Sequence, residues 1–293
     1  MTQGPFFKKI LFFAVPVTLT GLLQIVYNTA DTAVVGQFAG KTALAAVGST
    51  GSMIGLIVNL FTGLSMGAGV LTARMLGAKN AAGTRRAVHT AMGLSVLSGL
   101  LIAVIGVLFS PTLLRWMQAP EDTIALSTLY VRIYFLGAPG SMAFNFGAAI
   151  IRATGDTGRP LRYLAASGLV NVLLNLFTII VLHWGVAGVA AATISSQYLT
   201  AFLAVRRLVT AEEDIRLTLK NIRFSRAELK EILRIGVPAG IQNALFSVSN
   251  VIIQSNVNGF GSDAMAGISA GSNYDAYIYT ASKGDGNTVH SAA

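Results

Sequence analysis

Long runs without Asp, Glu, Lys or Arg restrict the fold of this sequence more than any other feature. The runs cover residues 10–30, 42–73, 87–114, 133–151, 163–205 and 235–262, and a weaker run, interrupted by Asp275, covers 264–281. The first six reach the roughly 18–20 apolar residues that cross a bilayer as a helix, and 163–205 fits two helices joined at His183-Trp184-Gly185. Transmembrane strands would instead alternate over about ten residues. The sequence therefore predicts an all-α integral membrane protein with seven helices and a weak eighth.

Charge is scarce and unevenly distributed along the chain. Only 11% of the residues are charged and 53% are hydrophobic, whereas a soluble domain has about 25% charged residues. Most lysines and arginines lie before the first run, between the second and third, between the fourth and fifth, and from Arg206 to Arg234. These loops fall on one side of an alternating bundle. The positive-inside rule makes that side the cytoplasm and places the N-terminus there.

The same residues exclude several classes of function. We attribute the net charge of +9 to topology and to contact with the anionic lipid bilayer. We expect no nucleic acid partner, because no basic patch is interleaved with aromatic residues. The chain has no cysteine, and its histidines, His89, His183 and His290, are isolated in the sequence. The sequence therefore predicts no metal site, no cofactor and no enzyme, and it indicates no oligomeric state.

The first and last thirds of the chain carry the same pattern. Val15-Pro16, Asn28 and Phe38 recur as Val237-Pro238, Asn250 and Phe260, with the same separation in each pair. Duplication inside an apolar chain is how many secondary transporters are built. We therefore expect a six-helix N-terminal lobe over 1–208 and a solvated cytoplasmic connector over 209–230. Residues 231–293 are expected to form an incomplete second lobe with a seventh helix, a partial eighth and a polar tail.

Asp31 is the one acidic residue expected within a strongly apolar helix. Thr20, Gln24 and Asn28 precede it at spacings that place all four side chains on one helical face. Exposure to lipid at mid-depth would cost a carboxylate roughly 2.5–3.5 kcal/mol. We therefore expect the stripe to face an outward-open cavity in which Asp31 binds and releases a cation, with Pro16 bending the helix as a hinge. Alternatively, Asp31 extends its carboxylate into water at the outer interface.

Two further sets of polar residues are candidate partners for Asp31. Asn171, Asn175 and Thr178 share one face of the fifth predicted helix, and Tyr130 and Tyr134 lie four residues apart near the start of the fourth. Neutral hydrogen-bonding groups can accommodate either protonation state of a carboxyl. The alternatives are that the asparagines only hold helices together and that the tyrosines are interfacial anchors.

Several segments, read together, resemble the multidrug and toxic compound extrusion (MATE) family of cation-coupled antiporters. They are residues 14–16, 28–36, 67–69, 76–80, 152–160 and 236–240. The resemblance implies two six-helix lobes around a cavity in the bacterial cytoplasmic membrane, coupling to H⁺ or Na⁺, and export of small-molecule amphipathic organic cations. Asp31, Asn171 and Asn175 match positions that the family uses in its N-lobe cation site.

The sequence also departs from this family. Members have about twelve helices, whereas residues 282–290 are too polar to complete an eighth span. We therefore expect a C-terminally truncated transporter that is inactive alone. Ile253 occupies the repeat position that corresponds to Asp31, so helix 7 has no matching acid. Two alternatives are a lipid-linked glycan flippase of the same superfamily and an inert structural half-transporter.

Overall fold

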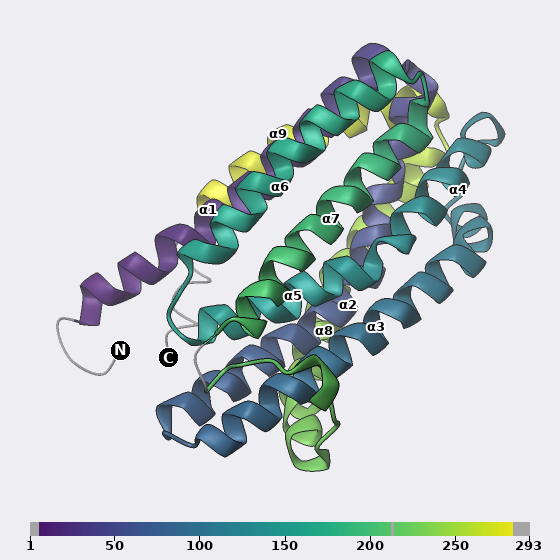
Figure 1. The fold of residues 1–293 in the computed structure, drawn as a ribbon. Helices are drawn as coiled ribbons and strands as arrows, with labels where there is room; N and C mark the ends of the chain where they lie inside the picture. The colour runs from purple at the N-terminus through teal and green to yellow at the C-terminus, as the bar shows by residue number, and fades with distance from the viewer. Residues whose placement is uncertain (1–5, 212–213, 284–293) are drawn as a thin grey trace.

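The regular elements of the protein are helices throughout the part that the structure describes (Figure 1). The structure is a computed structural model that describes the backbone of residues 6–211 and 214–283 and the side chains of 15–211 and 214–272. The predicted polar tail at 284–293, with His290, and the side chain of Asp275 lie outside these ranges. The elements are α1 (Phe6–Phe38), α2 (Lys41–Gly77), α3 (Ala81–Trp116), α4 (Glu121–Leu136), α5 (Ala138–Ala153), α6 (Gly158–Leu176), η1 (Phe177–Val181), α7 (Gly185–Val209), η2 (Leu219–Asn221), α8 (Arg226–Asn258) and α9 (Ser262–Lys283).

The helices confirm an all-α membrane fold. Within the described ranges, α2, α3, α6 with η1, α7 and α8 are each long and apolar enough to cross a bilayer. Helix α1 covers the first predicted run and α9 the last. The predicted turn between the two halves of 163–205 is also confirmed, because His183 and Gly185 adopt positive φ angles of 53° and 54° between η1 and α7.

The fourth span differs from the prediction of one helix over 133–151. The structure has two helices, α4 and α5, bent by 47° at Gly137, and α4 begins twelve residues before the predicted start, at Glu121. Pro139 lies in the first turn of α5 and has no backbone N–H to continue the helix of α4. Gly137 also lies so close to Gln197 and Ile194 of α7 that a Cβ would overlap them. The break therefore has two causes: the local sequence at Pro139 and the close packing of Gly137 against α7.

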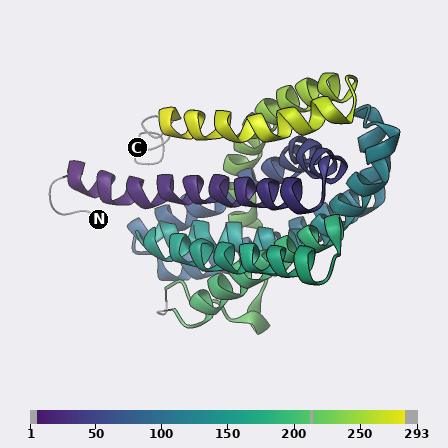
Figure 2. The ribbon, with the colours of Figure 1, turned by 90° about the horizontal axis from the view of Figure 1, so that it is seen from above.

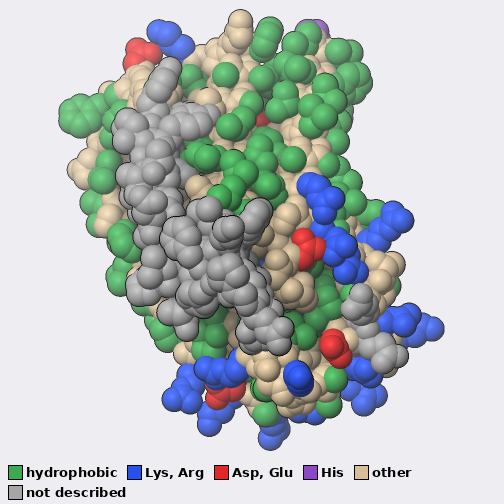
Figure 3. All heavy atoms as spheres, turned by 90° about the vertical axis from the view of Figure 1, so that its left-hand side faces the viewer, with side chains coloured by type: hydrophobic (Ala, Val, Ile, Leu, Met, Phe, Trp, Pro, Cys, Tyr) green, Lys and Arg blue, Asp and Glu red, His purple; other side chains and the backbone are tan. Residues whose placement is uncertain are grey.

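The two ends of the bundle differ in chemistry. Large hydrophobic side chains are exposed along the flanks of the bundle, as expected for contact with lipid, and Figure 3 shows them over much of one face. Lys and Arg side chains gather mostly toward the lower end and the right-hand edge of that face in Figure 3. Trp116 at the end of α3 and Trp184 before α7 are 76% and 56% exposed. Exposed tryptophans at helix ends are typical of a membrane–water interface.

Helices α2 and α8 cross at a contact made of small residues. Gly63 and Gly67 of α2 face Gly236 and Gly240 of α8, and a Cβ at any of the four would overlap the partner backbone. The four-residue spacing places each pair on one helical face, which lets the backbones approach closely. The second copy of the repeat is thereby packed directly onto the first lobe.

The repeat is visible in the helices as well as in the sequence. Helices α1 and α8 are each 33 residues long and each contains the repeated proline, Pro16 or Pro238. Helix α2 packs against α8, and α1 packs against α9, which lies beside it in Figure 2. Lys41, which begins α2, and Asp263 in the first turn of α9 form an exposed ion pair with a 3.6 Å separation. Corresponding helices of the two copies therefore meet at the start of α2 and α9.

The connector is shorter and better packed than predicted. The solvated stretch expected over 209–230 is reduced to the residues between Val209 and Arg226, because α8 already begins at Arg226. Within it, Ile215 and Leu217 are buried, and the Leu217 N–H donates to the Leu208 carbonyl over 2.9 Å. Alternation of apolar and polar residues lets this extended segment bury one side against the bundle.

Candidate functional site

The carboxylate of Asp31 lies between α1 and α6, which run side by side in the same direction (Figure 1). The Nδ2 group of Asn175 donates a hydrogen bond to Oδ1 of Asp31. One turn earlier on α1, the Tyr27 hydroxyl donates to the Leu164 carbonyl over 2.5 Å. The Tyr27 ring fits there because Gly168 has no side chain. The tyrosine therefore fixes how α1 lies on α6 and brings Asp31 level with Asn175.

A chain of buried amides extends from Asp31 into the bundle. Asn175 Nδ2 also donates to Asn171 Oδ1 over 3.2 Å, and Asn171 Nδ2 donates to Ser196 Oγ of α7 over 3.4 Å. Asn171 is 4% exposed and Asn175 1% exposed. The predicted proximity of Asp31 to this helix face is confirmed for Asn175 directly and for Asn171 through Asn175. The side chain of Asp31 is half-buried, and the alternative that its carboxylate extends into water at the outer interface stays a prediction.

The Oδ1 atom of Asn175 is buried and has no hydrogen-bond partner among the described residues. A buried acceptor left unpaired is costly, so native proteins rarely retain one without a use. Here the unpaired oxygen belongs to the side chain that already binds Asp31. A proton donor or a small cation at this position would satisfy it.

The backbone next to Asn175 is irregular. Helix α6 ends at Leu176 and continues as the π-helical turn η1, in which Thr178 is buried and its hydroxyl lies 3.3 Å from the Asn175 carbonyl. Gly188 of α7 leaves room for the Thr178 side chain. Single π-helical turns are uncommon and frequently occur at functional sites. The spacing in the sequence predicted a shared face for Thr178, but it gave no signal for the π turn.

Tyr130 is buried in the bundle and Tyr134 is partly buried beside it. Tyr130 is 7% exposed, and the two rings have centroids 6.0 Å apart. Gln197 of α7 lies against Gly137 at the end of α4, and its buried Oε1 has no hydrogen-bond partner among the described residues. Burial excludes Tyr130 as an interfacial anchor, and for Tyr134 that alternative stays a prediction. Gln197, like Ser196, was missed at the sequence level because periodicity within one helix does not show which neighbour it meets.

Two residues of the predicted polar stripe on α1, Gln24 and Asn28, are not brought to the carboxylate. Both are exposed, and the described structure shows no hydrogen bond from either side chain to Asp31. Pro16 lies inside a continuous α1, where its carbonyl accepts a hydrogen bond from the Thr20 hydroxyl over 2.7 Å. The proposed hinge therefore remains a prediction.

Among the described residues, no group of three or more His, Cys, Asp or Glu side chains is placed to hold a metal ion. Ile253, the repeat counterpart of Asp31, is 60% exposed on α8. Arg132, which directly precedes the apolar run 133–151, is exposed on α4. Within the described part of the chain, the hydrogen-bonded cluster thus holds one acid among neutral groups, which suits one monovalent charge.

Comparison with known proteins identifies the lobe that carries this site. The sequence model of the MatE family matches residues 16–177, which include Asp31, Asn171 and Asn175. The chain is 28% identical over its whole length to the probable multidrug resistance protein YpnP of Bacillus subtilis, covering 65% of that protein. It is 30% identical over 88% of its length to the probable multidrug resistance protein YoeA of Bacillus subtilis, covering 58% of it.

The fold leads to the same group of proteins. A solved structure described as the inward-facing conformation of a multidrug resistance MATE family transporter superposes with a TM-score of 0.78 at 28% identity. The match covers 84% of this chain and 56% of that one. The chain thus spans less than two thirds of the length of these relatives. The family match, the relatives and the helical architecture agree, and the chain belongs to the MATE family.

Proposed function

We propose that this chain forms the cation-coupling lobe of an efflux transporter that exports amphipathic organic cations in exchange for H⁺ or Na⁺. Two relatives are named as multidrug resistance proteins, which supports drug efflux as the activity. The observation that carries the proposal is the hydrogen bond between Asp31 and Asn175, beside the unpaired Oδ1 of Asn175. The titratable carboxyl of Asp31 is thus bonded to a side chain whose own acceptor, Asn175 Oδ1, has no donor among the described residues.

Either coupling ion would use the same atoms. A protonated Asp31 could donate its O–H to Asn175 Oδ1, while its other oxygen continues to accept from Asn175 Nδ2. A sodium ion could be held by the carboxylate together with amide oxygens of Asn175 and Asn171, because hard cations prefer oxygen ligands. Both ions neutralise the only charge in the cluster. The carboxylate, when vacated, would favour an organic cation over a neutral compound.

Coupling requires that the outward-open and inward-open states bind the ion and the drug with different affinities. We propose that the outward-open state binds H⁺ or Na⁺ at Asp31, that α1 bends at Pro16, and that the shrinking cavity expels the drug. The inward state would then release the ion and reload drug. A ligand shifts such an equilibrium only by as much as it binds the two states differently. Orientation with the N-terminus in the cytoplasm is part of this proposal.

Drug efflux from vesicles tests the role of Asp31. The protein would be this chain extended by the C-terminal part of YpnP with which it does not align, and ethidium the substrate. We expect Asp31→Asn to reduce ion-driven efflux to the background rate, because asparagine cannot exchange a charge. Asp263→Asn is the matched control, since Asp263 is 86% exposed and pairs only at the surface with Lys41. Normal efflux by Asp31→Asn under an imposed ion gradient would refute the coupling role.

Cation binding can be tested on this chain without transport. Infrared difference spectra on addition of Na⁺, or on a pH change, report the C=O stretch of a protonated carboxyl. We expect a carboxyl band that is absent from Asp31→Asn and unchanged in Asp263→Asn. A band that Na⁺ removes indicates that both ions compete for one site. Spectra identical in wild type and Asp31→Asn would show that Asp31 binds neither ion.

A further inference from the structure

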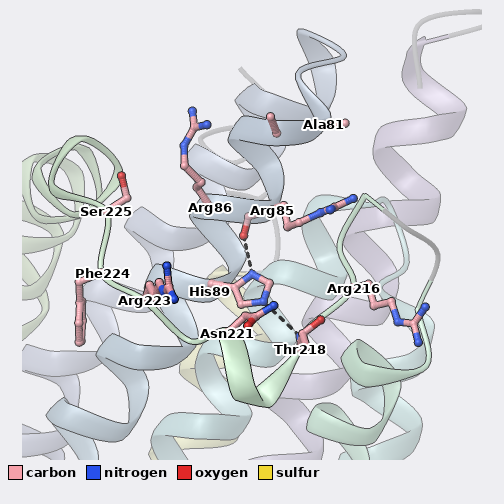
Figure 4. Close-up of a pocket in the computed structure, with 11 residues that line it drawn as sticks. Ala81, Arg85, Arg86, His89, Arg216, Thr218, Asn221, Arg223, Phe224 and Ser225 are labelled. Carbon is pink, nitrogen blue, oxygen red and sulfur yellow. Dashed lines mark hydrogen bonds between the residues drawn. The ribbon is translucent and has the colours of Figure 1, made fainter.

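A second polar site lies at the basic end of the bundle, away from Asp31. A cavity of about 820 Å³ opens between the first turns of α3 and the connector (Figure 4). Its lining includes Arg85, His89, Arg216, Arg223 and Phe224. No Asp or Glu lines it within the described ranges. None of these residues belongs to the Asp31 cluster, and the inference below does not depend on the proposed transport function.

Buried polar side chains of α3 hold the connector in place over this cavity. The Thr218 N–H donates to Nε2 of His89 over 3.1 Å, and Nδ1 of His89 lies 2.8 Å from the Arg85 carbonyl (Figure 4). Because a backbone N–H can only donate, Nε2 is the acceptor and Nδ1 carries the proton. On the other side of the cavity, the Ser225 N–H donates to the Thr90 hydroxyl oxygen over 3.1 Å. The connector backbone is thus fixed two residues after each of its cavity arginines, Arg216 and Arg223.

Among the described residues, one arginine of the cavity is paired with an acid. Arg86, which also lines it, pairs with the buried carboxylate of Glu228 at 2.7 Å. Arg85, Arg216 and Arg223 are exposed, and the described part of the chain shows no ion pair for any of them. Three guanidinium groups from two segments thus surround one cavity without a described acid to balance them.

Helix geometry adds to this charge. Ala81 and Ala82, the first residues of the 36-residue helix α3, line the cavity. The first N–H groups of a helix have no acceptor within it, and the aligned peptide dipoles make this end positive. In α3 the side chain of Asn80 accepts a hydrogen bond from the Gly83 N–H over 2.9 Å. The two residues between them, Ala81 and Ala82, face the cavity. Helix N-termini beside arginines are well suited to bind phosphate.

We propose that this cavity binds a phosphate-bearing anion. Guanidinium groups match phosphate in planar, paired hydrogen bonds, and the fixed connector holds two of the three in position. The phosphate could belong to an anionic phospholipid or to a soluble phosphorylated compound. Phe224, 50% exposed beside the cavity, offers an apolar surface next to the charges, as a lipid headgroup with its glycerol and acyl carbons would need.

The test uses the full chain and two charge-matched variants. The cavity variant is Arg85→Gln/Arg216→Gln/Arg223→Gln, and the control is Arg162→Gln/Arg206→Gln/Lys230→Gln, which removes exposed charges from the same end outside the cavity. The single variant Arg216→Gln provides a minimal change in case the triple variant does not fold. Far-UV circular dichroism and gel filtration verify that each protein is folded.

Two arms distinguish the sources of the phosphate. In the first, native mass spectrometry counts phosphatidylglycerol retained by protein released from phosphatidylcholine–phosphatidylglycerol vesicles. In the second, calorimetry measures binding of glycerol 3-phosphate and inorganic phosphate to protein in phosphatidylcholine alone. We expect the cavity variant to weaken binding about tenfold or more in at least one arm, with a smaller loss for Arg216→Gln and wild-type binding by the control.

Selective loss in the first arm alone assigns a lipid headgroup, and selective loss in the second assigns a soluble phosphate. Equal binding by wild type and cavity variant in both arms would overturn the proposal. An equal loss in the cavity variant and in the control would overturn it as well, because the effect would then come from net charge rather than from this cavity.

Discussion

At the residue scale, the environment of each polar side chain decides whether it can act. Asp31 and Gln24 share one face of α1, yet only Asp31 meets a partner, because α6 brings Asn175 to it. Asn175 in turn uses its Nδ2 group twice and leaves Oδ1 unpaired. One amide therefore both orients the carboxylate and supplies the free acceptor. Its removal should affect ion binding without removing a charge.

Asn175→Ala is predicted to weaken Na⁺ binding by about tenfold or more. The variant removes the amide oxygen proposed as a ligand of Na⁺, and losing a polar contact to a charged group costs about 1.5–3 kcal/mol. Infrared titration of the Asp31 carboxyl is the measurement. Asn145→Ala is the matched control, since Asn145 lies on α5 and bonds only to Ser141 of its own helix in the described structure. A titration of Asn175→Ala that coincides with wild type would show that the amide does not participate.

At the scale of elements, close backbone contact at the α2–α8 crossing helps to join the two copies of the repeat. Four glycines let α2 and α8 cross with their backbones in contact. Gly51 is also in α2, but a Cβ added there has nothing within 4 Å. Substitution of glycine by alanine should therefore change the free energy of unfolding in opposite directions at Gly63 and Gly51.

Gly63→Ala is predicted to lower the free energy of unfolding by about 1–3 kcal/mol, because the new methyl group would overlap Gly240 and force α8 away. Gly51→Ala should instead raise it by up to about 1 kcal/mol, since alanine favours the helix. Thermal unfolding in detergent, followed by far-UV circular dichroism, measures both. Equal changes in the two variants would show that the α2–α8 crossing contributes nothing specific to stability.

At the scale of the whole molecule, the bundle is asymmetric along the membrane normal. Most basic residues and the connector occupy one end, whereas exposed tryptophans and the Lys41–Asp263 pair occupy the other. From the positive-inside rule we expect the first end to face the cytoplasm. The proposed anion site then lies near the cytoplasmic face and the proposed cation site nearer the outer face. Each is therefore exposed to the ligands of a different compartment.

Cysteine accessibility is predicted to confirm this orientation. The chain has no cysteine, so a single introduced thiol can be followed without background. In intact cells, a membrane-impermeant maleimide should label Lys41→Cys but not Lys220→Cys, and permeabilised cells should label both. Both side chains are exposed, so access to solvent within the protein does not limit either reaction. Labelling of Lys220→Cys alone in intact cells would reverse the assigned topology.

Properties that depend on local composition could be predicted from the sequence. The spans other than the fourth, the turn at His183–Gly185, the repeat and the candidate role of Asp31 follow from hydropathy, spacing and the cost of a charge in lipid. These terms belong to a segment and need no partner. Periodicity also proposed the helix of Asn171 and Asn175 as a partner of Asp31, and the family resemblance agreed with it.

The contacts of each segment depend on how the helices pack in three dimensions. This packing broke the fourth span at Gly137, closed the connector onto α3 through His89, turned α6 into a π-helix beside Asn175 and left Gln24 uncovered. Periodicity specifies which face of a helix a residue occupies, but the neighbour on that face depends on how distant helices pack. The unpaired oxygen of Asn175 and the arginine cavity both arise from such packing, which is why neither could be found in the sequence.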